Sequence, residues 1–279
     1  METIWILARR VAKASYEDDI FSYAAQLGFY FMLALFPALL GITALLGMLP
    51  PEVVVPTLMP YAEKILPADS LSLVDQYVEQ LGQAGGGGVF SMSLLGALWA
   101  ASWGMMAIIN SLNVVFRVQE TRPLWKSFCI AILLTVGAAA FVMISLSLIL
   151  AGKTLSQWVA DTTGFDWWVN VIWSVLQWPV VIVLFLTAID LIYKWAPNNL
   201  KDWQWVTPGS LLAVLLWILL SVGLKVLVEN FINYHLVYGS ITGVIILMMW
   251  LYLSGLSLLI GGELNAVLHK SEIQRNGSD

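Results

Sequence analysis

Long apolar stretches alternate with short charged segments along this chain, and their lengths predict membrane-spanning helices. In the longest, residues 237–268, no Lys, Arg, Asp or Glu occurs between Glu229 and Glu263. Its apolar core exceeds the roughly 20 residues with which an α-helix crosses a hydrocarbon layer about 30 Å thick. It also lacks the two-residue alternation of a barrel strand, the other structure that satisfies every backbone group in lipid. We therefore expect a spanning helix with Glu263 near one end.

Five further stretches have the same character, which predicts an all-α fold: a polytopic membrane helical bundle with six transmembrane helices. Their approximate ranges, the stretch above included, are 24–48, 89–116, 128–151, 169–193, 205–227 and 237–268. Pro37 in the first span and Pro179 in the fourth each remove a backbone donor, so a kink or hinge is predicted at both. Residues 20–268 together form the predicted transmembrane domain.

The segments outside the predicted spans differ from one another. In residues 1–19, apolar side chains recur at helical spacing with the basic ones largely opposite, which predicts an amphipathic interfacial helix whose cations lie near anionic headgroups. An ordinary solvated helix is the alternative. Residues 50–88, rich in proline and acids, are predicted to be an external segment with one or two short amphipathic helices. Residues 269–279 are predicted to be a short, polar, disordered tail.

The basic residues predict the orientation of the bundle. If the N-terminus is cytoplasmic, ten of the 13 Lys and Arg residues fall on the inner side, and only Lys64, Lys153 and Lys225 fall outside. Cytoplasmic loops of membrane proteins carry this excess of positive charge. The pattern therefore places both termini in the cytoplasm, in agreement with an even number of spans.

Composition narrows the functional classes. The chain is 59% apolar and 11% charged, whereas soluble domains carry about 25% charged residues. A net charge of −5 argues against a nucleic-acid partner, which needs a basic face for phosphate contacts. One cysteine and two distant histidines, His235 and His269, provide no metal-ligand spacing. We expect membrane lipids as partners and neither a metal nor a cofactor.

The cytoplasmic ends of several predicted spans carry polar side chains, and the three acids Glu17, Asp18 and Asp19 precede the first span on the same side. An ionised side chain at the bilayer centre costs roughly 2.5–3.5 kcal/mol on insertion scales, so such residues usually face a protein interior or a cavity. We predict that six of them line one inward-facing polar cavity and bind substrate there: Asn110, Asn113, Arg117, Asp190, Glu263 and Asn265. The alternative is that each is an isolated boundary residue, with Asp190 pairing with Lys194 one helical turn later.

Several sequence blocks match one family in order. They are AAQLGFYFMLALFPALL (24–40), NVVFRVQETRPLWKS (113–127), DLIYKWAPN (190–198) and the stretch 207–266, which includes YGS and ends in GELNA. On these blocks the chain resembles the YihY/virulence factor BrkB family of bacterial inner-membrane proteins, formerly labelled ribonuclease BN. The resemblance implies six spans, a location in the inner (plasma) membrane, and roles linked to serum resistance and to tolerance of altered lipopolysaccharide precursors. The nuclease label has no support in the residues, because no cluster of metal ligands is present.

Three functions remain open from the sequence. The first is a transporter or flippase that moves a lipid-like or small amphiphilic substrate through the polar cavity. The second is a non-transporting membrane scaffold or accessory subunit, in which small residues of the second and sixth spans pack copies into a homo-oligomer. The third is a membrane enzyme with two carboxylates as acid and base, but no activated nucleophile is evident, so we expect no enzyme.

Overall fold

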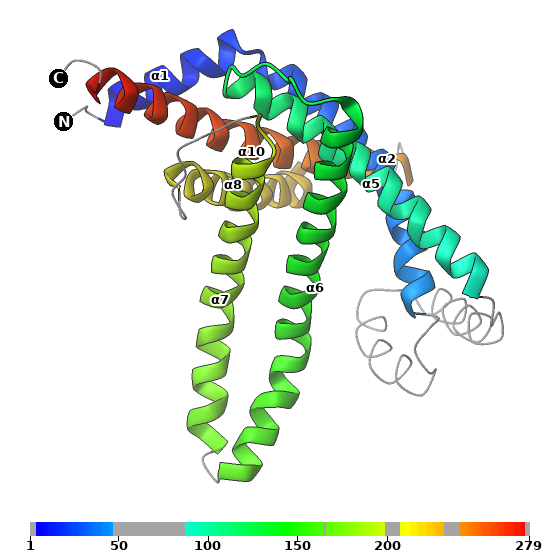
Figure 1. Ribbon diagram of the computed structural model, residues 1–279. Coiled ribbons are helices and arrows are strands. Elements are labelled where there is room, and N and C mark those ends of the chain that lie inside the picture. Colours follow the sequence, from blue (N-terminus) through cyan, green and yellow to red (C-terminus); the bar gives the residue numbers. More distant parts are fainter. Residues whose placement is uncertain (1–3, 47–86, 164–165, 199–206, 232–239, 277–279) are drawn as a thin grey trace. The chain divides into compact units, whose positions relative to one another are not determined.

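The computed structural model describes residues 4–46, 87–163, 166–198, 207–231 and 240–276 (Figure 1). All regular elements in these ranges are α-helices, so the predicted all-α class is confirmed for the described chain. They are α1 (Ile4–Glu17), α2 (Ile20–Leu46), α5 (Gly87–Val115), α6 (Leu124–Thr163), α7 (Asp166–Trp195), α8 (Pro208–Phe231) and α10 (Ser240–Asn276).

Five of these helices are long and apolar enough to cross a membrane. The apolar segments are Leu95–Val115 in α5, Leu124–Ser145 in α6, Val175–Trp195 in α7, Pro208–Val228 in α8 and Thr242–Lys270 in α10. They correspond to the second to sixth predicted spans. In α2 the part with described side chains is the apolar segment Ile20–Leu35, which by itself is shorter than a span. The sixth transmembrane helix and the orientation of the bundle therefore remain predictions.

Two helices are longer than their predicted spans. α6 continues to Thr163, beyond the predicted end at 151, and α10 continues to Asn276. The segment 269–279 is therefore helical over most of its length rather than irregular. The physical reason is that no glycine or proline interrupts the chain between Glu263 and Asn276. The external segment 50–88 lies outside the described residues, except that 87 and 88 begin α5.

The chain forms two compact units, Met1–Phe31 with Gly104–Asp279, and Met32–Trp103. In the smaller unit, the rings of Trp99 and Trp103 meet edge to face with centroids 6.0 Å apart. Every contact described below lies within the larger unit.

Helices α8 and α10 pack as an antiparallel pair. The indole N–H of Trp217 donates to Ser254 Oγ at 3.0 Å, and that of Trp250 donates to Ser221 Oγ at 3.1 Å. The two indole rings lie against each other with centroids 6.0 Å apart. These reciprocal bonds satisfy groups that lipid would leave without partners and fix the register of the pair.

At the other end of this pair the backbones of α8 and α10 come unusually close. A methyl group added to Gly209 would collide with the carbonyl oxygen of Gly261, and one added to Gly261 would collide with that of Gly209. Small residues at helix contacts allow such an approach within a membrane. A glycine also allows close packing of α2 against α10, where Gly28 faces the backbone of Tyr252.

Helices α6 and α7 form a second antiparallel pair and run side by side (Figure 1). Many of their large apolar side chains are exposed, Val142, Val175 and Trp178 among them. A soluble protein rarely exposes so much contiguous apolar surface, whereas a lipid-facing surface is expected to be apolar.

Helix α1 packs against α10 through one face. Val11, Ala14 and Ser15 are buried on this face, while Trp5 and Tyr16 are exposed. The helix ends at Glu17, and Asp19, whose φ is 50°, lies in the turn that precedes α2. The buried face of α1 thus covers part of α10. The position of α1 at a membrane surface remains a prediction.

Candidate functional site

Three polar clusters lie among the apolar helices of the larger unit. The first, the capping cluster, consists of Asp190 on α7, Thr207 and Ser210 at the start of α8, and Asn265 on α10. Asp190 Oδ1 accepts hydrogen bonds from the backbone N–H and the hydroxyl of Thr207, at 3.3 and 2.7 Å. Its Oδ2 accepts one from the Ser210 hydroxyl at 3.1 Å. The side chain is 2% exposed and lies at a helix N-terminus, where negative charge is favourable.

The capping cluster satisfies the first turn of α8, whose backbone N–H groups have no partner within the helix. Pro208 at the first helical position has no N–H to satisfy. Gly209 N–H donates to Asn265 Oδ1 at 2.8 Å, and Ser210 N–H donates to Thr207 Oγ1 at 3.2 Å. Asn265 also donates to that hydroxyl at 2.9 Å. The cluster therefore joins three spans and has a complete structural explanation.

The second polar cluster, the loop cluster, consists of Asn113 at the end of α5, Glu120 and Arg122 in the α5–α6 connection, and Asn198 after α7. Asn113 Nδ2 donates to Glu120 Oε2 at 2.9 Å, and Asn113 Oδ1 accepts from the backbone N–H of Asn198 at 2.9 Å. Arg122 donates to both carboxylate oxygens of Glu120 and to the carbonyl of Ala196 at 2.8 Å. The cluster ties together two connections that are far apart in the sequence.

The Glu120 carboxyl has a lowered pKa of about 2, chiefly because Arg122 donates hydrogen bonds to it and secondarily because the Asn113 amide does the same. A carboxyl whose pKa is lower in the folded state stabilises the fold above its unfolded pKa. That stabilisation is lost as pH falls through the folded value. The relevant window therefore lies between about 4.5 and about 2.

Replacing Glu120 with glutamine is expected to flatten the acid side of the stability profile. In the wild type, the melting temperature of the detergent-solubilised protein should fall as pH drops from about 4.5 to about 2, because Glu120 takes up a proton and loses its bond to Arg122. The melting temperature of the variant should fall less over this pH range, and it should be lower than that of the wild type near neutral pH. Thermal unfolding followed by tryptophan fluorescence measures both. Parallel profiles for the two proteins would contradict this explanation.

The third polar cluster, the carboxyl cluster, consists of Glu17 and Asp18 at the α1–α2 junction, Arg117 after α5, and Glu263 on α10. Arg117 Nε and Nη2 donate to Asp18 Oδ2 at 3.1 and 3.0 Å. Nη2 also lies 3.8 Å from Glu17 Oε2. The bond to Asp18 raises the pKa of the Arg117 guanidinium above its ordinary value. The guanidinium therefore holds two acids that precede α2.

Arg117 occupies a backbone position that usually belongs to glycine. Its φ is 53°, and its N–H donates to the Val114 carbonyl at 2.8 Å while Val118 N–H donates to the Asn113 carbonyl at 2.9 Å. These two bonds form the Schellman motif that ends α5. A non-glycine residue in the left-handed region costs about 1–2 kcal/mol. The ion pair with Asp18 explains why an arginine occupies the position in spite of that cost.

Glu263 is the most deeply buried member of the carboxyl cluster, with 1% of the residue exposed. Its carboxyl lies within hydrogen-bond reach of Asp18 and interacts electrostatically with Arg117. Its Oε1 is buried and has no hydrogen-bond partner among the described residues. Buried polar atoms are almost always paired, so this one calls for an explanation.

Five of the six residues predicted to share a cavity lie in these clusters. Asn113 is in the loop cluster, Asp190 and Asn265 are in the capping cluster, and Arg117 and Glu263 are in the carboxyl cluster. The sixth, Asn110, is exposed on α5 and belongs to none of them. The shared cavity therefore remains a prediction.

The two predicted hinge prolines differ in what the structure shows. Pro179 is exposed inside α7, and the helix continues through it from Asp166 to Trp195. Pro37 lies in α2, but its side chain is outside the described part. A hinge at either position remains a prediction.

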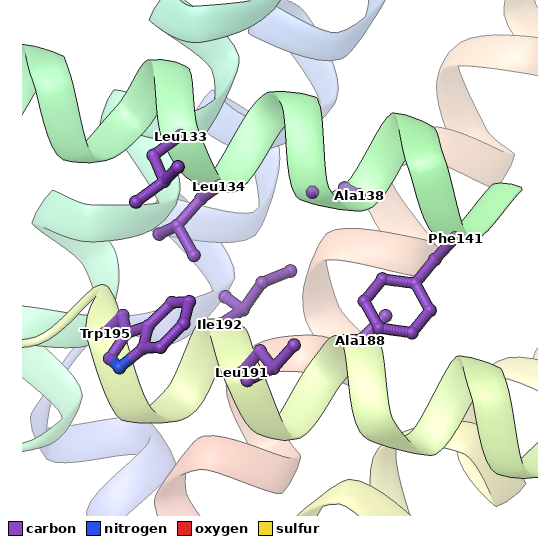
Figure 2. Close-up of a pocket in the computed structure, with 9 residues that line it drawn as sticks. Leu133, Leu134, Ala138, Phe141, Ala188, Leu191, Ile192 and Trp195 are labelled. Atoms are coloured by element: carbon purple, nitrogen blue, oxygen red, sulfur yellow. The ribbon is translucent and has the colours of Figure 1, made fainter.

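A small pocket lies between α6 and α7, and its lining is apolar (Figure 2). Leu133, Ala138 and Phe141 from α6 face Ile192 and Ala188 from α7 across it. None of the six predicted cavity residues lines this pocket. At one end it reaches Trp195, the neighbour of Ala196, whose carbonyl accepts from Arg122. The apolar pocket thus ends beside the loop cluster.

The partners that hydrogen-bond to these residues are not evident from the sequence. The role of Thr207 is the easiest of them to predict, because a threonine followed by proline is a typical start for a helix. Glu120 and Asn198 lie in connections, and no spacing rule relates residues in two separate loops. Asp18 precedes the first predicted span in the sequence, but its contact with Glu263 depends on how α10 packs.

Comparison with known proteins agrees with this membrane-helical architecture. The family model described as Virulence factor BrkB matches residues 11–279. The chain belongs to the virulence factor BrkB family. This confirms the family resemblance drawn from the sequence blocks.

Relatives in this family carry membrane-protein or nuclease-like names. The Bacillus subtilis (strain 168) protein named "Putative ribonuclease-like protein YfkH" is 34% identical over 249 residues, which are 89% of this chain and 90% of that protein. A UPF0761 membrane protein of Vibrio cholerae is 27% identical over 67% of this chain and 62% of its own length. Another from Xanthomonas oryzae pv. oryzae is 30% identical over 58% of this chain and 39% of its own length. No solved structure matches the chain.

Proposed function

We propose that this BrkB-family membrane protein is a transporter or flippase for a lipid-like or small amphiphilic substrate. The observation that carries the proposal is Glu263, a carboxyl buried in an apolar helix long enough to span the membrane. An ionisable side chain within a spanning segment is expensive and usually marks a substrate or ion pathway. The buried Asp190 supports the proposal less, because capping α8 explains it.

The geometry around the α6–α7 pocket supports an amphiphilic substrate. The pocket offers a small apolar surface, and it ends beside the loop cluster, where Arg122 is paired with Glu120. An amphiphile needs both environments next to each other. The substrate pathway in this proposal therefore runs from the α6–α7 pocket toward the polar clusters.

We also infer that the polar clusters face the cytoplasm and that the protein lies in the bacterial inner membrane with both termini inside. The support is the ten-to-three distribution of basic residues across the predicted spans. With that orientation, the clusters on α5, α7 and α10 gather at the inner leaflet. They are the groups from which a cytoplasm-facing cavity would be built.

Lipid translocation in liposomes tests the proposal. The purified protein is reconstituted with a fluorescent phospholipid, and an impermeant reductant bleaches the outer leaflet as the lipid crosses. We expect the wild type to accelerate crossing over protein-free vesicles. Glu263→Gln should slow it at least about tenfold, which corresponds to about 1.4 kcal/mol in the barrier. Gly223→Ala, at an open position on α8, serves as the matched control and should retain the wild-type rate.

Two outcomes would count against transport. If wild-type protein moves neither the labelled phospholipid nor a small fluorescent amphiphile, the scaffold alternative is favoured. If Glu263→Gln moves lipid as fast as wild type, the buried carboxyl has no part in the pathway. The scaffold alternative is supported by the close helix contacts at Gly209 and Gly28, which are typical of tightly packed bundles.

We further infer that the chain is not a ribonuclease, although one relative is named as ribonuclease-like. The support is the net charge of −5 and the wide separation of the two histidines. Among the described residues there is also no group of three or more His, Cys, Asp or Glu side chains placed to hold a metal. A nuclease requires a surface that attracts phosphates.

A further inference from the structure

Glu263 is a buried acid with one carboxyl oxygen that accepts no hydrogen bond from the described residues. Asp190 is also buried, but Thr207 and Ser210 donate to both of its oxygens. Glu263 Oε1, in contrast, has no partner among the described residues. A buried ionised carboxylate without compensating donors is far more costly than a neutral carboxylic acid. The two acids are therefore in different electrostatic situations.

The partner of Glu263 is another carboxyl group. A hydrogen bond between Asp18 and Glu263 requires that one of them carry a proton, because two carboxylates have only acceptors. Arg117 donates two hydrogen bonds to Asp18 Oδ2, which favours the charged form of Asp18. The proton then belongs on Glu263, which donates it to Asp18.

We propose that Glu263 and Asp18 form a proton-binding site, with the proton held on Glu263 at neutral pH. Two carboxyl groups this close cannot both be ionised without strong repulsion, so they share one proton. The missing partner of Glu263 Oε1 fits this assignment, because that atom is then the carbonyl oxygen of a neutral acid. The bound ligand is the proton itself.

The charged groups around the site come from the α1–α2 junction and from the α5–α6 connection. The charged groups that interact with Glu263 are Asp18 from the α1–α2 junction and Arg117 from the α5–α6 connection, and Glu17 lies against Arg117. The ring of Tyr193 on α7 packs against Gly262, but its hydroxyl donates to the carbonyl of Leu258. Asp18 has 15% of its side chain exposed and is the group through which a proton leaves to water. The site is thus buried on the α10 side and open on the α1 side.

Loss of the proton would change the contacts between α10 and the start of α2. Two carboxylates would then compete for the single guanidinium of Arg117, and its bond to Asp18 would weaken as Glu263 took a share. This consequence rests on the proposed function, in which movement of the helices opens a path for substrate. The binding of the proton does not depend on transport.

Infrared spectroscopy of the reconstituted protein tests the site without any transport assay. A protonated carboxylic acid has a C=O stretching band that a carboxylate lacks. Wild-type protein at neutral pH should show such a band, and a component of it should shift when glutamate alone carries ¹³C at its carboxyl carbon. Isotope labelling needs no mutation, so the test holds even if a variant fails to fold.

Variants then assign the band to a residue. The glutamate component should be absent from Glu263→Gln and present in Glu120→Gln, whose carboxyl lies in the loop cluster. A wild-type spectrum without a glutamate component, or a component that persists in Glu263→Gln, would overturn the proposal. Lipid translocation that fails while the band is present would reject the transport function and leave the proton site standing.

Discussion

Replacing Gly209 with alanine should destabilise the protein by about 3 kcal/mol, at the upper end of the cost of overpacking. The added methyl group would collide with the carbonyl oxygen of Gly261 and with the side chain of Asn265. A backbone carbonyl in a helix cannot rotate away, so α8 and α10 would have to separate. That separation would also break the bond from Gly209 N–H to Asn265, which measures 2.8 Å.

The same substitution elsewhere on α8 provides the control. A methyl group at Gly223 meets no atom within 4 Å. Glycine to alanine inside a helix ordinarily stabilises it by roughly 0.5–1 kcal/mol. We therefore expect Gly223→Ala to melt at or above the wild-type temperature and Gly209→Ala to melt well below it or to aggregate. Equal melting temperatures for the two variants in detergent would contradict the close contact of α8 with α10.

Replacing Asp190 with alanine should cost about 3 kcal/mol of unfolding free energy. The carboxylate accepts from Thr207 N–H, from the Thr207 hydroxyl and from the Ser210 hydroxyl. Without it the N–H and the hydroxyl of Thr207 lose their acceptor, whereas the Ser210 hydroxyl keeps the Thr207 carbonyl at 2.8 Å. Each unsatisfied group costs about 1–3 kcal/mol before water or rearrangement compensates. The favourable charge at the N-terminus of α8 is lost as well.

Asp190→Asn separates the charge from the hydrogen bonds. Asparagine keeps one acceptor oxygen, so this variant should lose less stability than Asp190→Ala. Thr187→Ala on the same helix removes an exposed hydroxyl that donates to the Val183 carbonyl, and such a surface change should stay within about 0.5 kcal/mol. Chemical unfolding in mixed micelles measures all three. If Asp190→Ala were as stable as Thr187→Ala, Asp190 would not be the cap of α8.

The spanning helices could be predicted from the sequence because apolar length alone decides whether a segment crosses lipid. That rule found α5, α6, α7, α8 and α10. It could not set where the helices end outside the membrane, where apolar length no longer applies. The extension of α10 to Asn276 depends instead on the lack of a helix-breaking residue.

The individual residues of the polar clusters could be predicted from the sequence, but their contacts with one another could not. Ionisable residues in apolar helices are visible in the sequence, and both Asp190 and Glu263 were identified in that way. Their surroundings depend on which helices touch, and one-dimensional periodicity does not contain that information. Asp190 caps α8 because Thr207 lies beside it, whereas Glu263 has a second carboxyl group, that of Asp18, as its neighbour.

The ratio of lipid translocation rates between wild type and Glu263→Gln, in vesicles that contain equal amounts of folded protein, tests the central claim most directly. That claim is that a carboxyl buried in α10 takes part in moving an amphiphile across the membrane. We predict a wild-type rate clearly above that of protein-free vesicles and a variant rate lower by about tenfold or more. Equal rates for the two proteins would contradict it.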